Sequence, residues 1–252
     1  MISFKFNLSH ARAVRAWHKW FYPRPDASDA AGLAVYFHCA HRGKVPGFRR
    51  DPKYTPLISL KKSEDDIFAA FGKNTKHKIK RALTEGMIFS VESSMEVLEK
   101  AYNEFARAKD IGPMDKKTLK AYWPKMITTK LTHEGEVLVV HGFVHDADLK
   151  RVNLQWGASR FRSTDDPQQQ NLIGRANRLL HYLDMLYMRE RGIEVFDLGG
   201  YALNTTNPEL IQVNEFKAGF GGQIVEESTY SSLPLMLLRR TKAMISGLRK
   251  EL

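Results

Sequence analysis

Residues 174–222 decide the fold, and they read GRANRLLHYLDMLYMRERGIEVFDLGGYALNTTNPELIQVNEFKAGFGG. Apolar side chains recur at helical spacing in the first part, which predicts one long amphipathic helix that ends at Arg191-Gly192. Residues 193–198, IEVFDL, are typical of a buried strand. A helix that leads through one glycine into a strand is half of an α/β unit, so the sequence predicts an α/β fold.

The predicted strand ends at Gly199-Gly200, where the missing Cβ atoms let another group approach the backbone. The same two glycines are also compatible with a simple turn, and the local sequence favours neither interpretation. After a loop, residues 216–222 read FKAGFGG. We expect a strand there, anchored by Phe216 and Phe220, with Lys217 on the opposite side from Phe216.

Asp197-Leu198-Gly199-Gly200 and the later motif Phe216-Lys217-x-x-Phe220-Gly221-Gly222 resemble the end of the catalytic domain in Fem-type aminoacyltransferases, and the related acyltransferases of the GNAT superfamily. Residues 71–91, FGKNTKHKIKRALTEGMIFSV, are similar to the first basic helix of that family and the strand after it. The resemblance implies a GNAT-like mixed twisted sheet with flanking helices. Because the chain is short for this family, it also implies a reduced second GNAT-like half.

On this basis we expect three parts of the chain. Residues 1–92 form the reduced N-terminal half, residues 93–230 form the GNAT-like catalytic domain, and residues 231–252 form a helix that packs back on the N-terminal half. The pattern predicts strands at 32–39, 57–60, 87–91, 136–144, 151–158 and 224–227. It predicts the other helices at 10–22, after Ser63, and at 73–81, 95–109, 118–131 and 233–250. Residues 41–56 and 160–171 are expected to be loops.

The composition excludes several classes of protein. The single cysteine, Cys39, rules out an internal disulfide framework, and no cluster of residues is typical of a metal site. No apolar run reaches the length of a membrane span and the N-terminus has no secretory pattern, so we expect a cytoplasmic protein. The net charge of +11 favours a polyanionic partner, such as a nucleic acid, a nucleotide or an anionic membrane surface, although it also serves solubility.

Positive charge is concentrated in the predicted helix at 73–81, KNTKHKIKR, which carries no acid. Such a one-signed run favours anion binding over a merely solvated face. We expect Lys76, Lys80 and Arg81 to contact an anionic substrate.

Acyl transfer needs a place for the phosphates of the donor, because its common carriers are nucleotides. Helix N-termini attract such anions through free N–H groups and the helix dipole. Asn171, Gly174, Arg175 and Ala176 partly resemble the GNAT pyrophosphate loop, Gln/Arg-x-x-Gly-x-Gly/Ala, at the expected start of the long helix. Asn171 departs from that pattern, and the same residues fit an ordinary helix start equally well.

Acyl transfer also needs a positive group where negative charge develops on the carbonyl oxygen. The resemblance implies that Lys217 stabilises this oxyanion; without the resemblance, a surface lysine is the simpler interpretation. Asp197 is expected either to orient the acceptor amine or to serve as a structural acid. His141, His145 and His181 are alternative proton acceptors, each of which is more typical of a structural histidine.

The resemblance further implies a cleft where residues 154–159 separate from residues 195–198. Substrate contacts are expected from residues around that cleft, namely Trp156, Gly199, Gly200, Tyr201 and Phe216. The expected function is transfer of an acyl group from a coenzyme A thioester to an amine on a cell-envelope or polysaccharide precursor, either a small molecule or lipid-linked. A charged tRNA is the alternative donor, and a nucleic-acid-binding module without catalysis is the alternative class. No permanently bound cofactor or metal is expected.

Overall fold

The computed structural model describes residues 1–7 and 15–248 of this chain. They form two compact units, Thr55–Ile224 and a smaller unit of Met1–Tyr54 with Val225–Leu252. Neither boundary coincides with the division expected at residue 92, because the helices and the strand between residues 64 and 91 belong to the larger unit. Whether the smaller unit is a reduced copy of the larger one, with the last helix packed on it, stays a prediction.

The larger unit contains a mixed sheet with the strand order β4-β9-β8-β7-β6-β5, as predicted for the fold class. Neighbouring strands in this sheet are antiparallel except β8 and β9, which are parallel. The expected hairpin of β7 and β8 is confirmed. The bounds are β4 (Phe48–Ser59), β5 (Ile88–Val91), β6 (Met126–His133), β7 (Glu136–Asp146), β8 (Arg151–Ser159) and β9 (Val195–Asp197).

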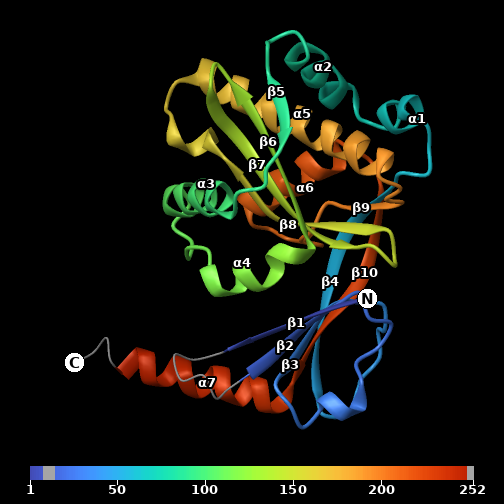
Figure 1. The fold of residues 1–252 in the computed structure, drawn as a ribbon, viewed down its shortest axis with the longest axis vertical. Helices are drawn as coiled ribbons and strands as arrows, with labels where there is room; N and C mark the ends of the chain where they lie inside the picture. Colours follow the sequence, from blue (N-terminus) through green and yellow to red (C-terminus); the bar gives the residue numbers. More distant parts are fainter. Residues whose placement is uncertain (8–14, 249–252) are drawn as a thin grey trace. The chain divides into compact units, whose positions relative to one another are not determined.

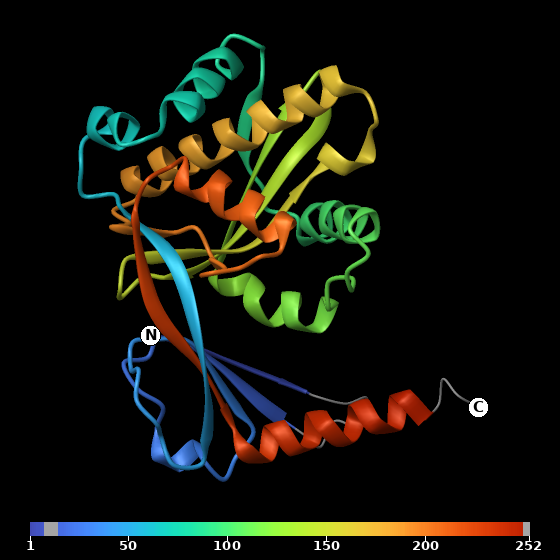
Figure 2. The same ribbon diagram turned by 180° about the vertical axis from the view of Figure 1, so that it is seen from behind.

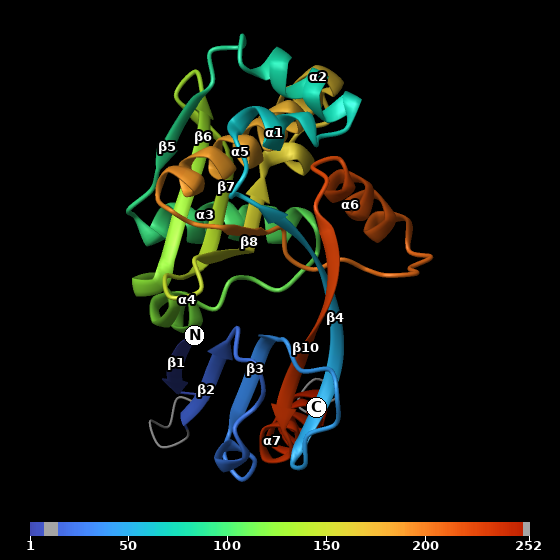
Figure 3. The ribbon, with the colours of Figure 1, turned by 90° about the vertical axis from the view of Figure 1, so that its right-hand side faces the viewer.

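Helices cover both faces of this sheet (Figure 1). The long helix α5 packs on one face with α1 and α2, while α3 and α4 pack on the other (Figure 3). The apolar stripe of α5 supplies much of the larger core, including Ile173, Leu180 and Met185. The helices are α1 (Glu64–Ala69), α2 (Lys73–Ala82), α3 (Met95–Ala108), α4 (Lys116–Tyr122), α5 (Pro167–Glu190) and α6 (Pro208–Ala218).

The long helix begins seven residues earlier than the sequence pattern suggested. Asp166 caps α5, its carboxylate accepting a hydrogen bond from the Gln168 N–H at 2.9 Å, and Pro167 occupies the first position. Gly174 therefore lies inside the helix, so the expected helix start at this glycine is wrong.

Two other element predictions for the larger unit are wrong. Residues 216–218 belong to the end of α6, not to a strand, because the Asn207 side chain caps a helix that starts at Pro208. The helix expected at 118–131 ends before the short 3₁₀ turn Trp123–Lys125, and residues from Met126 onward pair with β7 along all of β6. In that second case the strand pairing overrides the local preference.

The smaller unit has the strand order β1-β2-β3-β10-β4, which Figure 3 shows side by side. The helix expected at 10–22 is wrong for residues 15–20, which form a strand paired with both neighbours, and residues 8–14 lie outside the described part. The loop expected at 41–56 is wrong from Phe48 onward, where β4 begins. The remaining bounds are β1 (Ile2–Asn7), β2 (Arg15–Trp20), β3 (Ala34–Cys39), β10 (Gln223–Ser232) and α7 (Leu233–Leu248). Among the described residues, no helix combines the length and the apolar character needed to cross a membrane.

Candidate active site

The site is organised where β8 and β9 separate. Their pairing ends at Asn153↔Asp197, although β8 continues to Ser159. Gly199, the second residue after β9, has a φ of 72°, and a Cβ on it would lie 2.8 Å from the carbonyl oxygen of Leu154. Glycine is therefore required at this point, and the separation expected between these strands is present.

A pocket of about 460 Å³ lies beside this separation, and we call it the Lys217 pocket. Its wall is formed by the second half of β8, the middle of α5, one side of α6 and the end of α3. Figure 2 shows α6 close to α5, and the rings of His181 and Phe216 join the two helices with centroids 5.2 Å apart. Residues on the wall include Leu154, Asn177, His181, Phe216 and Lys217.

Lys217 lies in the last turn of α6 and is half-buried. Its Nζ donates hydrogen bonds to the carbonyl oxygens of Gly199 at 3.0 Å and of Gly200 at 2.5 Å. Burial lowers the pKa of the Lys217 ammonium to about 8, against the opposing effect of the nearby Asp197 carboxylate. The two glycines thus fix a cation at the strand ends, and one of its three N–H bonds has no acceptor among the described residues.

Asp197 is fully buried, and protein groups surround its carboxylate. Its oxygens accept hydrogen bonds from the guanidinium of Arg151 at 2.5 Å, from the hydroxyl of Thr55, and from the N–H of Gly199 at 2.8 Å. These contacts favour the structural alternative, in which Asp197 shapes the turn that holds Lys217.

A buried polar network lies behind the pocket wall. The Asp184 carboxylate contacts His141 Nδ1 at 2.7 Å and accepts a hydrogen bond from the Thr129 hydroxyl at 2.6 Å, while His141 Nε2 lies 3.2 Å from Asn177 Oδ1. Burial lowers the pKa of His141 and raises the pKa of Asp184, so desolvation disfavours the charged form of each group. Because both ring nitrogens of His141 are engaged, the network is suited to hold Asn177 in place.

The other two histidines considered from the sequence differ in position. His181 lines the pocket, where burial lowers the pKa of its ring to about 3, and its Nδ1 lies 2.8 Å from the backbone oxygen of Asn177. His145 does not line the pocket. Sequence reasoning missed Asp184, although an acid among the leucines of a helix is the usual signal of a buried polar partner.

The predicted donor-binding residues do not form a pyrophosphate loop. Residues 171–176 lie within α5, where their N–H groups belong to the helix, and Ala176 is fully buried. Gly174 lines the Lys217 pocket. Asn171 and Arg175 line a different hollow of about 780 Å³ between α2 and α5, which we call the α2–α5 groove.

The basic helix contributes only part of its charge to that groove. Arg81 lines it together with His77 and Lys78, whereas Lys76 and Lys80 are not among its lining residues. Lys76 Nζ instead donates a hydrogen bond to the Ala69 carbonyl at 2.9 Å.

The remaining predicted substrate contacts divide between two faces of the sheet. Phe216 lines the Lys217 pocket, but Trp156 packs against Tyr122 with centroids 5.7 Å apart, in the cluster beneath α3 and α4. Gly200 is exposed and Tyr201 half-buried, and neither lines the pocket.

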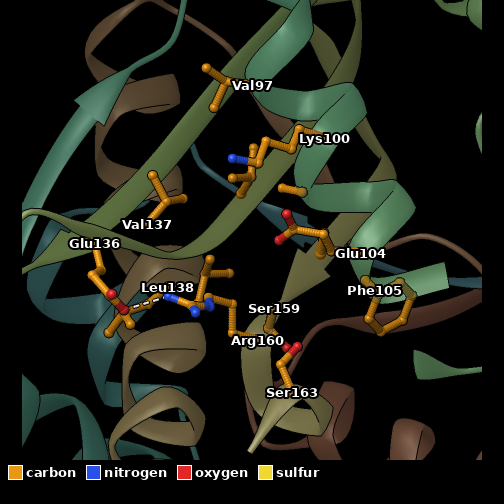
Figure 4. A pocket seen from close by; sticks show the side chains of 14 residues that line it. Val97, Lys100, Glu104, Phe105, Glu136, Val137, Leu138, Ser159, Arg160 and Ser163 are labelled. Atoms are coloured by element: carbon orange, nitrogen blue, oxygen red, sulfur yellow. Dashed lines mark hydrogen bonds and ion pairs between the residues drawn. The ribbon is translucent and has the colours of Figure 1, made fainter. Parts of the chain in front are cut away.

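A further cavity of about 330 Å³ was not foreseen from the sequence. It lies between α3 and the adjoining ends of β7 and β8, and shares Phe105, Ala158 and Ser159 with the Lys217 pocket. Figure 4 shows Lys100 and Glu104 of α3 on one side of it, with the ion pair of Glu136 and Arg160 on another. The two cavities are therefore neighbours around the end of β8.

No protein-family model matches this chain, and no curated protein matches it in sequence. Solved structures do resemble it. FemX aligns with a TM-score of 0.60 at 12% identity, covering 77% of this chain and 68% of FemX. L-PGS from Bacillus licheniformis aligns with a TM-score of 0.55 at 15% identity, covering 86% and 74% of the two chains.

The C-terminal domain of a protein assigned as a lysylphosphatidylglycerol synthetase, from Agrobacterium fabrum, gives a TM-score of 0.54 at 15% identity and covers 91% and 80%. Identities this low concern the fold alone. The chain therefore has the mixed-sheet fold that FemX shares with L-PGS, as the motifs around Gly199 and Lys217 implied.

Proposed function

We propose that this protein is an acyltransferase that moves an aminoacyl group from a charged tRNA to an amine, with the reaction in the Lys217 pocket. The observation that carries the proposal is the position of the Lys217 ammonium, held by two glycine carbonyls where β8 and β9 separate. A fixed cation beside an open cleft is suited to stabilise a carbonyl oxygen that becomes negative.

The proposed reaction needs no covalent enzyme intermediate. The acceptor nitrogen attacks the ester carbonyl carbon, a C–N bond forms and the C–O bond to the ribose breaks. The proton that the amine loses ends on the released ribose oxygen. Lys217 contributes by lowering the energy of the oxyanion between these two steps, so its interaction is stronger in the transition state than with bound substrate.

The α5 N-terminus bears on the choice of donor. The carboxylate of Asp166 occupies that end by accepting from the Gln168 N–H, and Asp165 precedes it. Two acids at the positive end of a helix disfavour a pyrophosphate there. Since residues 171–176 lie inside the helix, they do not favour a pyrophosphate loop for coenzyme A, and the +11 charge favours tRNA.

Other parts of the proposal rest on the resemblance to Fem-type enzymes. The acceptor is an amine on an amino sugar or peptide of a cell-envelope precursor, small or lipid-linked. The reaction takes place in the cytoplasm, and an anionic membrane surface is a possible contact for the basic protein. The neighbouring cavity at Phe105, Ala158 and Ser159 offers room for the acceptor next to the donor.

The proposal is tested with the full chain and three ligands: aminoacyl-tRNA labelled on the amino acid, uncharged tRNA and acetyl coenzyme A. We expect both tRNAs to raise the melting temperature and acetyl coenzyme A to leave it unchanged. We expect label to move from the charged tRNA to amino sugars or peptides, and the Lys217→Met variant to bind tRNA without transferring label.

Two results would contradict this proposal. Acetyl transfer from acetyl coenzyme A would show that the donor is a coenzyme A thioester. Salt-sensitive tRNA binding by the parent protein, with no transfer to any amine, would make it a binding module.

A further inference from the structure

Arg178 stands out in the wall of the Lys217 pocket because its polar contacts are incomplete. Its Nη1 donates to the backbone oxygen of Gly174 at 3.0 Å, and its guanidinium carbon lies 4.8 Å from the centre of the Phe216 ring. Its Nε is buried and has no hydrogen-bond partner among the described residues. The side chain is thus held on two sides while the edge that carries Nε is unused.

The acids around this pocket are already engaged. Glu209 contacts Arg162 at 3.1 Å and Lys109 at 3.9 Å. Asp184 is held by His141 and Thr129 in the network behind the wall. No carboxylate forms an ion pair with Arg178 or with Lys217 within the described part of the chain.

The farther groove shows the opposite arrangement on the same helix. One turn before Arg178, the guanidinium of Arg175 makes a bidentate ion pair with Glu85, with distances of 2.9 and 2.6 Å. Arg175 therefore has a carboxylate partner, as expected of an arginine with a structural role. In contrast, Arg178 has no carboxylate partner among the described residues, although burial lowers the pKa of its guanidinium and so disfavours its charge.

A guanidinium offers two parallel donors along one edge, which match the oxygens of a carboxylate or phosphate. Phe216 and the Gly174 carbonyl fix the plane of the Arg178 group, so little conformational entropy remains to be lost when an anion binds. A bound anion would also supply the missing partner of Nε.

We propose that Arg178 is a substrate-binding residue that holds an oxyanion, carboxylate or phosphate, in the Lys217 pocket through its Nε edge. The inference rests on the proposed function, because it assigns the substrate of that function an anionic group near the transferred acyl carbon. Two sources share this chemistry: a carboxylate on the transferred group or acceptor, and a phosphate at the nucleotide end of the donor.

The test is calorimetric titration of the full chain with two probes, glutarate for the carboxylate and adenosine 5′-monophosphate for the phosphate. We expect Arg178→Gln to weaken binding of at least one probe by roughly tenfold or more, the loss of a charge-assisted hydrogen bond. The probe affected identifies the source. The control is Arg162→Gln, which removes an exposed pocket cation already paired with Glu209, and it should change either affinity by less than about threefold.

A second variant, Arg178→Lys, keeps the charge and removes the two-donor edge, so its affinity should lie between those of the parent and Arg178→Gln. Equal affinities of the parent and Arg178→Gln for both probes overturn the inference, as does a parent that binds neither probe at millimolar concentration. Parent affinity in Arg178→Lys overturns the two-donor contact.

These titrations measure binding without turnover. Their failure therefore leaves Lys217-dependent transfer untouched, and a failure of transfer leaves the anion site standing.

Discussion

Cations line both the Lys217 pocket and the α2–α5 groove, but they differ in whether a carboxylate of the protein pairs with them. In the groove, Arg81 and Arg175 share the carboxylate of Glu85. In the pocket, Lys217 and Arg178 have no carboxylate partner among the described residues: backbone carbonyls hold both, and the Phe216 ring also packs on Arg178. Cations whose charge the protein has not neutralised are the ones free to act on a ligand, so the position of unpaired charge is a better guide to the site than the net charge of +11.

Asp197 and Arg151 form a buried ion pair, and breaking it should have the largest effect on stability. Asp197→Ala leaves the Arg151 guanidinium largely buried without this partner. We expect the free energy of unfolding to fall by about 3–5 kcal/mol, measured by urea denaturation. The control is Glu194→Ala beside the same strand, whose half-buried carboxylate pairs only with the exposed Lys61 and Lys150 and should matter less.

If Asp197→Ala abolished transfer without changing the free energy of unfolding, Asp197 would have a catalytic role. In that case the buried pair would not be structural, and the contrast between paired and unpaired charges would fail.

The two glycines that hold Lys217 offer a sharper comparison. Gly199→Ala places a methyl group 2.8 Å from the Leu154 carbonyl oxygen in a backbone with a φ of 72°, whereas a Cβ on Gly200 meets no atom within 4 Å among the described residues. We expect Gly199→Ala to cost about 1–3 kcal/mol in unfolding free energy and to lower transfer, because the carbonyl that binds Lys217 must move. Gly200→Ala should be close to the parent in both measurements. Equal behaviour of the two variants would mean that the strand separation does not depend on Gly199.

Part of this arrangement could be predicted from the sequence. The cap at Ser63, the basic helix α2 and the β7–β8 hairpin follow from local patterns, whereas the separation at Gly199 was implied by the family resemblance. These patterns suffice because turn residues, caps and periodicity act over a few positions.

The rest depends on signals that are weak or non-local. The start of α5 was missed because its first turn, after Pro167, is polar and outside the apolar stripe, although Asp166-Pro167 is a typical cap. Asn207-Pro208 carries the same signal for α6. Strands β2 and β6 are set by pairing with distant partners. The Lys217 pocket and the α2–α5 groove differ in whether their cations pair with an acid. This pairing depends on tertiary packing and cannot be predicted from the sequence.

The basic helix tests whether charge outside the pocket contributes to tRNA binding. Reversing Lys76, Lys80 and Arg81 to glutamate should weaken tRNA binding about tenfold and reduce its salt dependence by roughly 0.7–0.9 per lost phosphate contact. The matched control reverses Lys116, Lys117 and Lys120 of α4, a short helix on the other face of the sheet. Binding is measured by filter retention at several salt concentrations. Equal affinities of parent and variant at low salt would show that the helix surface is merely solvated.

The smallest expected effect is on the pH dependence of stability. The pKa of Lys217 is about 8 in the folded protein against an ordinary value of 10.5, so the unfolded chain binds more protons between these pH values. The contribution of this lysine to stability should therefore rise with pH across that window. Lys217→Met removes this rise, so its stability advantage over the parent at pH 7 should shrink toward pH 10. A difference that stays constant with pH would mean that the Lys217 pKa is not lowered.

The most direct test of the account is steady-state transfer by Lys217→Met, with Lys217→Arg as the variant that keeps the charge. Losing the ammonium should lower turnover roughly a hundredfold or more while the Michaelis constant changes far less, because the interaction strengthens only as the oxyanion forms. Lys217→Arg should retain part of the rate, and the parent rate should fall as pH rises through the Lys217 pKa of about 8. Normal turnover in a folded Lys217→Met variant would contradict the assignment of the oxyanion to Lys217 and, with it, the placement of the reaction in this pocket.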